Sequence, residues 1–167
     1  MSSRKELPPT DYLRQLLDYN PETGIFKRKT SKGGFDAGTI VGTKRSKSIN
    51  IIIDYTSYKA HRIAWKIFYD QEPPFLIDHI DNNPYNNAIL NLREANLNQN
   101  LYNSKKSIKN TTGYKGVSFH KLSQKFRATI RINNKAVHLG LYETAEDAYS
   151  EYCKAAKKHF GEYARFK

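Results

Sequence analysis

The chain has 167 residues, and its composition is that of a basic, polar protein with a modest core. It carries 28 Lys and Arg residues against 16 Asp and Glu residues, and 38% of its residues are hydrophobic. A positive excess of this size indicates an anionic partner, and nucleic acid is the commonest one. The single cysteine, Cys153, excludes an internal disulfide and a cysteine-based zinc site. No apolar run reaches the roughly 18–20 residues of a membrane span, so we expect no membrane partner and a cytoplasmic protein.

The positive charge is concentrated in the last two-fifths of the chain. Residues 1–100 carry 14 basic and 11 acidic side chains, whereas residues 101–167 carry 14 basic and 5 acidic ones. A basic surface that only keeps a protein soluble has no need to be uneven. The asymmetry therefore favours a dedicated binding module near the C-terminus.

The first half of the chain predicts short helices and strands separated by turns. Residues 8–18 predict a helix with Thr10 as its N-cap, and residues 60–69 predict a second helix. Between the two, residues 25–60 contain short apolar strands divided by glycines. A basic loop interrupts these strands at residues 44–47.

The second half begins with a segment typical of a linker, because residues 103–113 lack apolar periodicity and are rich in Ser, Thr, Lys and Asn. Three strands are then predicted, at residues 116–120, 126–132 and 136–141. Asn133 and Asn134 form a tight hairpin turn between the last two. Residues 145–160, capped by Thr144, place their apolar side chains on one helix face, which we expect to pack on the sheet.

Asparagine is unusually dense between Asp78 and Asn100. Eight of these 23 residues are Asn, which is disfavoured in the interiors of helices and strands. Folding alone does not explain such a density. It supplies amide oxygens and amide donors to a turn-rich, polar site.

This segment resembles the HNH endonuclease family, in its phage and homing-type branch. The matching residues are Asp78 and His79, then Asn91 and Arg93, and then Asn100. The resemblance implies a metal site built from two strands and a helix. In that arrangement the His ends the first strand, the middle Asn lies in the loop, and the third polar residue lies on the helix.

The resemblance also implies a role for each residue. His79 is the general base, since a neutral imidazole near pH 7 can accept the proton of the attacking water. Asp78 and Asn100 hold one divalent cation, Mg²⁺ or Mn²⁺, through oxygen ligands. Asn91 braces the loop and orients His79. Because adjacent strand residues point to opposite faces, Asp78 and His79 can share one site only if the strand ends or bulges there.

Several neighbours of this motif admit a plainer interpretation. Asp81 is consistent with a carboxylate that initiates a turn, and His61 with a packed or capping residue of the second predicted helix. Arg93 either contacts a phosphate group or lies solvated. Trp65 and Phe68 are predicted to be core residues.

The tail, residues 113–164, resembles the AP2/ERF-type DNA-binding domain. The matching segments are residues 113–117, 126–131, 138–140 and 144–148. The resemblance implies a three-stranded sheet that lies in the major groove of DNA, with the helix behind it. The alternation of apolar and polar residues along 126–132 independently predicts one basic, exposed face. We therefore predict DNA contacts from Lys115, Ser118, His120, Lys125, Arg127, Thr129, Arg131 and His138.

Together these patterns predict an α+β protein in three parts. An N-terminal HNH nuclease domain with ββα-metal architecture occupies residues 1–103, with its core motif at 76–103. A linker follows at residues 104–112, and an AP2/ERF-like domain of three antiparallel strands packed on one helix occupies residues 113–167.

The predicted function is a site-preferring endonuclease of double-stranded DNA. We expect a homing-type nicking enzyme, encoded by a phage and acting as a monomer on DNA in its bacterial host. The alternative is a DNA-binding transcriptional regulator with an inactive nuclease domain. An RNA-binding protein fits the charge as well, but it leaves the nuclease motif unexplained.

Overall fold

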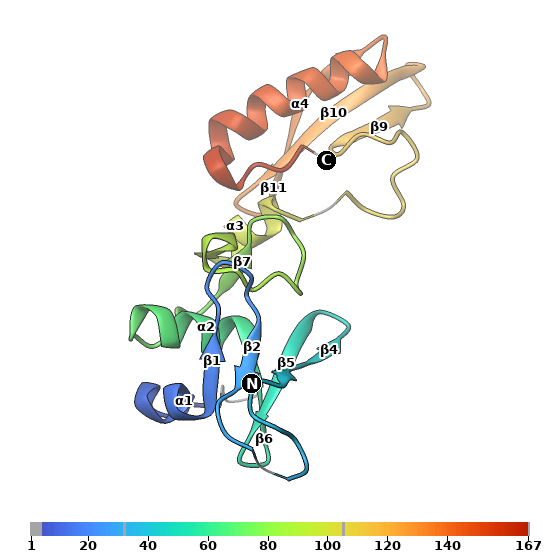
Figure 1. Cartoon of the computed structure of the whole chain (residues 1–167). Coiled ribbons are helices and arrows are strands. Elements are labelled where there is room, and N and C mark those ends of the chain that lie inside the picture. The colour runs from blue at the N-terminus through green and yellow to red at the C-terminus, as the bar shows by residue number, and fades with distance from the viewer. Residues whose placement is uncertain (1–4, 32, 105, 167) are drawn as a thin grey trace. The chain divides into compact units, whose positions relative to one another are not determined.

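A computed structural model describes residues 5–31, 33–104 and 106–166 (Figure 1). The chain divides into two compact units, Met1–Ala95 and Asn96–Lys167, and each is described by itself below. Within the described ranges, no helix is long and apolar enough to cross a membrane.

The first unit is built from small antiparallel sheets and short helices. One sheet has the order β1-β2-β3 and another the order β4-β5-β6. Their strands are β1 (Leu17–Tyr19), β2 (Phe26–Arg28), β3 (Ile40–Val41), β4 (Thr43–Arg45), β5 (Ser48–Ile53) and β6 (Thr56–Lys59). The core joins these sheets to the helices α1 (Thr10–Leu16) and α2 (Ala60–Tyr69), through residues such as Leu13, Phe26 and Ile63.

Helix α2 spans the predicted residues, whereas the start of α1 differs from the prediction. Thr10 lies inside α1, and Pro9 is the N-cap residue. Pro9 has the extended backbone of an N-cap residue, with ψ of 145°, and its side chain supplies no capping hydrogen bond. Trp65 packs against the core as predicted, but Phe68 is 48% exposed, so its assignment to the core was wrong. Phe68 instead meets the ring of Tyr69 edge-on at the surface.

A two-stranded hairpin carries the Asn-rich segment. Strand β7 (Ile77–His79) pairs with β8 (Leu92–Glu94), and the short 3-10 helix η1 (Ile89–Asn91) leads into β8. Helix α3 (Leu97–Tyr102) follows in the chain. The order strand, strand, helix and the ending of β7 at His79 both agree with the arrangement that the resemblance implied.

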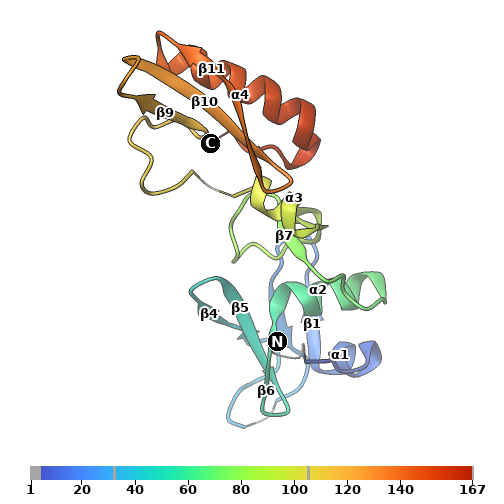
Figure 2. The ribbon, with the colours of Figure 1, turned by 180° about the vertical axis from the view of Figure 1, so that it is seen from behind.

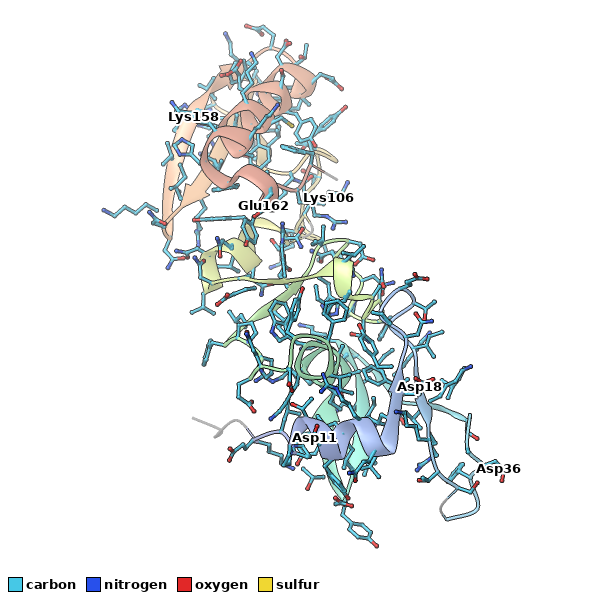
Figure 3. The ribbon with its side chains drawn as sticks, turned by 60° about the vertical axis from the view of Figure 1, so that its left-hand side comes forward. Asp11, Asp18, Asp36, Lys106, Lys158 and Glu162 are labelled. Carbon is cyan, nitrogen blue, oxygen red and sulfur yellow. The ribbon has the colours of Figure 1, made fainter. Side chains whose placement is uncertain are left out.

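The second unit contains the sheet and the long helix predicted for the tail. Strands β9 (Val117–His120), β10 (Lys125–Ile132) and β11 (Lys135–Tyr142) are antiparallel in the order β11-β10-β9. Helix α4 (Ala145–Phe160) lies across one face of this sheet, and the 3-10 helix η2 (Gly161–Tyr163) follows it (Figures 1 and 2). Exposed charged residues of α4 include Lys158 (Figure 3).

Local chemistry explains the ends of these elements. Asn133 and Asn134 both have positive φ, +48° and +64°, which the two-residue turn of a twisted hairpin requires. The Thr144 side chain accepts a hydrogen bond from the Asp147 backbone N–H at 3.1 Å and so caps α4. Apolar residues such as Ala128 and Ile130 are buried against the helix, as the alternation predicted.

The division between the units falls earlier than the predicted linker. Tyr102 of α3 stacks on Phe160 with ring centroids 3.7 Å apart, so α3 belongs to the second unit. The polar segment before β9 is also fastened: Asn110 Nδ2 donates to the Tyr114 carbonyl at 2.7 Å, and Thr112 Oγ1 to that of Val117 at 3.1 Å. Asn and Thr side chains often bond to nearby backbone, and a linker-like composition does not reveal this.

Candidate active site and nucleic-acid interface

His79 lies at the end of β7, beside two side chains from elsewhere in the first unit. Its Nε2 lies 3.3 Å from Oδ1 of Asn87, which is 1% exposed. The ring of His61, from the first turn of α2, meets the His79 ring edge-on with centroids 5.2 Å apart. This contact is compatible with the prediction that His61 is a packed residue, but the sequence did not indicate that it packs against His79.

The surroundings of His79 favour its neutral form. Burial lowers the pKa of His79, and the hydrogen bond with Asn87 and the carboxylates of Asp81 and Asp78 offset this only in part. The net shift is downward, so the imidazole is neutral near pH 7. A neutral imidazole is the form that can accept a proton.

Asn91 braces the loop that follows His79. Its Oδ1 accepts the backbone N–H of Asp81 at 3.0 Å, and its Nδ2 donates to Asp81 Oδ1 at 2.9 Å and to the Asn86 carbonyl at 2.8 Å. The bracing expected of Asn91 is therefore seen in its contacts. Whether Asn91 also orients His79 remains a prediction.

Asp81 does more than initiate a turn, because several donors of the loop bind its carboxylate. Besides Asn91, it accepts hydrogen bonds from the Asn83 backbone at 2.8 Å and from Asn86 Nδ2 at 2.8 Å. Burial acts to raise the pKa of this carboxyl, but the donors outweigh burial and hold the pKa below its usual range. The dense asparagines thus build a hydrogen-bonded loop around one ionised carboxylate.

Asp78 lies in the middle of β7 and is buried. Arg93, its direct cross-strand partner in β8, donates to Asp78 Oδ2 from Nε at 3.0 Å and from Nη2 at 2.9 Å. The side chains of strand neighbours point to opposite faces, so this ion pair lies on the other face of the hairpin from His79. Arg93 is therefore neither solvated nor directed at a phosphate here, because its guanidinium neutralises Asp78.

The predicted metal ligands come from different units. Asp78 belongs to the first unit and Asn100, on α3, to the second. Among the described residues, no three His, Cys, Asp or Glu side chains gather into a metal-binding cluster. One carboxylate and one amide oxygen are still suitable donors for a hard cation such as Mg²⁺, which keeps several of its waters.

The exposed face of the second unit's sheet carries most of the predicted DNA-binding residues. Arg127 and Arg131 are exposed on β10, while Ala128 and Ile130 between them are buried. Cross-strand pairing places Ser118 opposite Arg127 and His138 opposite Thr129, so these side chains share one face. A shallow hollow of about 450 Å³ on this face is lined by His120, Arg127, Thr129, Ala136, His138 and Leu141.

Two predicted DNA-binding lysines are engaged inside the unit. Lys115 Nζ donates to the carbonyl oxygens of Tyr102 and Ser104, both at 2.7 Å, and so closes the end of α3. Burial, together with Arg165, lowers the pKa of Lys115 to about 8. Lys125 pairs with Glu143 at 2.6 Å. The other predicted contacts lie on the open face, whereas these two ammonium groups already have protein partners.

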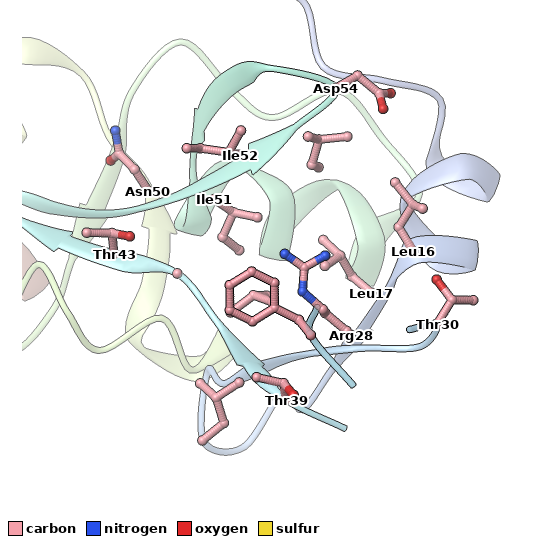
Figure 4. Close-up of a pocket in the computed structure, with 15 residues that line it drawn as sticks. Leu16, Leu17, Arg28, Thr30, Thr39, Thr43, Asn50, Ile51, Ile52 and Asp54 are labelled. Atoms are coloured by element: carbon pink, nitrogen blue, oxygen red, sulfur yellow. The ribbon is translucent and has the colours of Figure 1, made fainter. Parts of the chain in front are cut away.

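The first unit also holds a hollow of about 410 Å³ that contains none of the predicted site residues. It lies between β2, β3 and β5, and its walls combine apolar and polar side chains (Figure 4). The Arg28 guanidinium reaches into it and lies 5.1 Å from the centre of the Phe35 ring. The chemistry assigned to His79 does not involve this hollow.

Comparison with known proteins places the candidate site within a family. Residues 58–102 match the family model of the HNH endonucleases, so the matched domain lies in mid-chain rather than over residues 1–103 as predicted. The chain is 32% identical to Protein 3.8 of Escherichia phage T7 over 114 residues, which are 68% of this chain and 93% of that protein. No solved structure matches the chain. The AP2/ERF resemblance of the tail has no support in these comparisons.

Proposed function

This chain belongs to the same family as Protein 3.8 of Escherichia phage T7 and contains an HNH endonuclease domain, and from that we propose that it is a DNA endonuclease. The observation that carries the proposal is His79, held at the end of β7 inside the family match with its ring beside the buried Asn87. The pKa of His79, lowered by burial, supports a role as general base at neutral pH.

The hydrogen bond with Asn87 suggests how His79 handles a proton. An amide oxygen accepts hydrogen bonds, so the ring nitrogen that faces it, Nε2, carries the proton of the neutral imidazole. The proton of the attacking water then goes to Nδ1. The buried Asn87 thereby holds His79 in the tautomer that carries its proton on Nε2.

The family implies a divalent cation, and the structure fits one only in part, because Asp78 is paired with Arg93 on the face of the hairpin opposite His79. The resemblance assigns Asp78 and Asn100 to this ion, and a carboxylate and an amide oxygen are each a donor that suits Mg²⁺ or Mn²⁺. When bound, the cation neutralises charge on the scissile phosphate and stabilises the leaving 3′-oxygen. Arg93 meanwhile pairs with the buried Asp78, with its Nη2 2.9 Å from Oδ2.

The finer proposal concerns the mode of action. With one such site in each chain, a monomer on DNA nicks one strand and leaves 5′-phosphate and 3′-hydroxyl ends. The exposed sheet face of the second unit, in an AP2/ERF-like manner, would provide site preference. The relative from phage T7 supports a phage origin, and we propose further that the enzyme is of the homing type and acts in the cytoplasm of a bacterial host.

One observation favours the alternative of a DNA-binding regulator with an inactive nuclease domain. Asp78, the carboxylate assigned to the metal, is buried in an ion pair with Arg93. A guanidinium at this position competes with a cation for the same oxygen.

Conversion of supercoiled plasmid to open circle decides between the two. We expect conversion with Mg²⁺ or Mn²⁺, and none with a chelator. His79→Ala should lower the rate about 10²–10⁴-fold while DNA binding persists, as removal of a general base does. His159→Ala, at the exposed end of α4, is the matched control. If the wild type binds DNA but never nicks it, the regulator is correct.

A further inference from the structure

The end of the β4–β5 hairpin carries an exposed cluster of basic residues in the first unit, outside the candidate site. Residues 44–47 comprise the end of β4 and the two-residue turn that joins it to β5, and all four side chains are exposed. Three of them are cationic: Lys44, Arg45 and Lys47. We call residues 44–47 the basic tip (Figure 2 shows its hairpin).

The basic tip is fastened to the loop of the candidate active site by Tyr85. The Tyr85 hydroxyl donates to the Arg45 carbonyl at 2.9 Å and to the Ser46 carbonyl at 3.4 Å. The ammonium of Lys44 lies 5.3 Å from the centre of the Tyr85 ring, within the range of a cation–π interaction. The tip backbone is therefore attached to the loop that His79 precedes.

The connection from Tyr85 to His79 is short. Tyr85 is followed in the chain by Asn86, which donates to Asp81, and by Asn87, which faces His79. A group bound by the basic tip would thus have a defined place relative to the imidazole.

Apart from the contact of Lys44 with the Tyr85 ring, the charge of the basic tip is not used in an interaction among the described residues. Among the described residues, none of its three cations takes part in an ion pair. A cation that is only solvated gains little from a fixed backbone. Cations without an ion-pair partner, on a hairpin that is hydrogen-bonded to the loop after His79, suit the phosphates of a bound DNA strand.

We propose that the basic tip binds DNA phosphates next to the scissile bond, and that Tyr85 is the positioning residue that holds the tip in place. This proposal rests on the proposed nuclease function for the identity of the strand. The binding surface itself is tested below without any cleavage. The chemistry is that of charge-assisted hydrogen bonds from Lys and Arg to phosphate oxygens.

The first test measures binding to a labelled 30-base-pair duplex in a chelator at several salt concentrations. The variant Lys44→Ala/Lys47→Ala is compared with Lys157→Ala/Lys158→Ala on α4, which removes the same charge from exposed lysines. We expect the slope of log affinity against log salt to fall by about two units in the first and to stay unchanged in the second. Equal slopes in the two variants, or no binding by the wild type, would overturn the proposal.

The second test uses Tyr85→Phe, which keeps every charge of the tip. We expect the salt slope to stay at the wild-type value while affinity for the duplex falls about fivefold, the loss of one hydrogen bond. With Mg²⁺, kcat for nicking should fall more than KM rises, because a misplaced strand binds but reacts slowly. Wild-type affinity and kcat in this variant would remove Tyr85 from the proposal.

The two proposals fail in different ways. If the wild type does not nick plasmid but the tip variant loses two units of salt slope, the nuclease proposal is wrong and the binding surface stands. If the wild type nicks and the tip variant behaves like the α4 control, the nuclease stands and the basic tip is wrong. Thermal unfolding of each variant confirms that it is folded.

Discussion

Gly24 packs directly against the backbone of Asn87. A Cβ atom at position 24 would lie 2.3 Å from the carbonyl carbon of Asn87 and 2.3 Å from the backbone nitrogen of Ala88. The Tyr19 hydroxyl also donates to the Asn87 carbonyl at 2.8 Å, and the Ile89 N–H donates to the Pro21 carbonyl at 2.8 Å. The β1–β2 hairpin therefore holds the segment whose side chain faces His79.

Gly24→Ala is expected to disturb both stability and the candidate site. Gly24 has φ of +71°, which strains the backbone of any residue with a Cβ atom. In addition, the segment around Asn87 must move to make room for that Cβ atom. Strain of this kind costs about 1–3 kcal/mol. We expect a lower thermal midpoint and a nicking rate below that of the wild type.

Gly34→Ala is the matched control for this variant. Gly34 has a similar φ of +80°, but an added Cβ would meet no described atom within 4 Å. Gly34→Ala therefore has the strain of a positive φ but no overlap of the new Cβ atom with neighbouring atoms. Equal losses of nicking in the two variants would show that the contact with Asn87 has no effect on the site.

Arg93→Leu tests both the ion pair and the metal assignment. The Arg93 and Asp78 side chains are 12% and 4% exposed, so the change removes two donors from a buried carboxylate. Removing one partner of such a pair destabilises a protein by about 3–5 kcal/mol. If Asp78 is a ligand, millimolar Mg²⁺ should restore part of the lost thermal stability, because a cation can replace the guanidinium.

The control is the double variant Asp78→Asn/Arg93→Leu, which has no carboxylate to attract the ion. Its midpoint should not respond to Mg²⁺. A response of the same size in the single and double variants would place the ion elsewhere, and Asp78 would then be a purely structural residue.

Residues with strong periodicity were predictable from the sequence. Helix α2 and the buried residues Ala128 and Ile130 of β10 follow from spacing alone, because burial of one face determines the pattern. His79 was found by resemblance, since its neighbours in the motif are polar and carry no periodic signal.

The partners of these residues were not predictable. Asn87 and Tyr85 belong to an Asn-rich stretch in which the sequence does not distinguish one possible partner of His79 from another. The fold places Asn87 against His79 and Tyr85 against the Arg45 carbonyl. The basic character of Lys115 predicts a DNA contact, whereas in the structure its ammonium donates to carbonyl oxygens at the end of α3. Composition reports the charge of a side chain and not its tertiary partner.

Lys115→Met should change how stability depends on pH. The pKa of Lys115 is lowered by burial to about 8, while in the unfolded chain it has the ordinary value of 10.5. Between these values the unfolded state binds more protons, so this lysine makes the free energy of unfolding rise with pH. Relative to Lys115→Met, the wild type should gain stability as pH rises from about 8 to 10.5.

Urea unfolding at half-unit steps of pH measures this difference. The exposed Lys121→Met is the matched control, and its difference from the wild type should not follow the same curve. A constant difference between the wild type and Lys115→Met across this range would contradict the assignment.

Arg127→Ala and Arg131→Ala decide whether the exposed sheet face reads DNA. Both guanidinium groups are exposed on β10, on the face opposite the helix. If either reads a guanine in the major groove, its loss should cost about 1–3 kcal/mol on the preferred duplex and relax selectivity at one position. If it contacts only phosphate, the affinity for every DNA sequence should fall by the same factor, and the salt slope should fall by about one unit.

Binding of each variant to a duplex selected by the wild type and to a random duplex, at several salt concentrations, separates the two modes. Wild-type affinity and slope in both variants would mean that this face is not the DNA-binding surface, and we would then interpret the tail as a protein-interaction module.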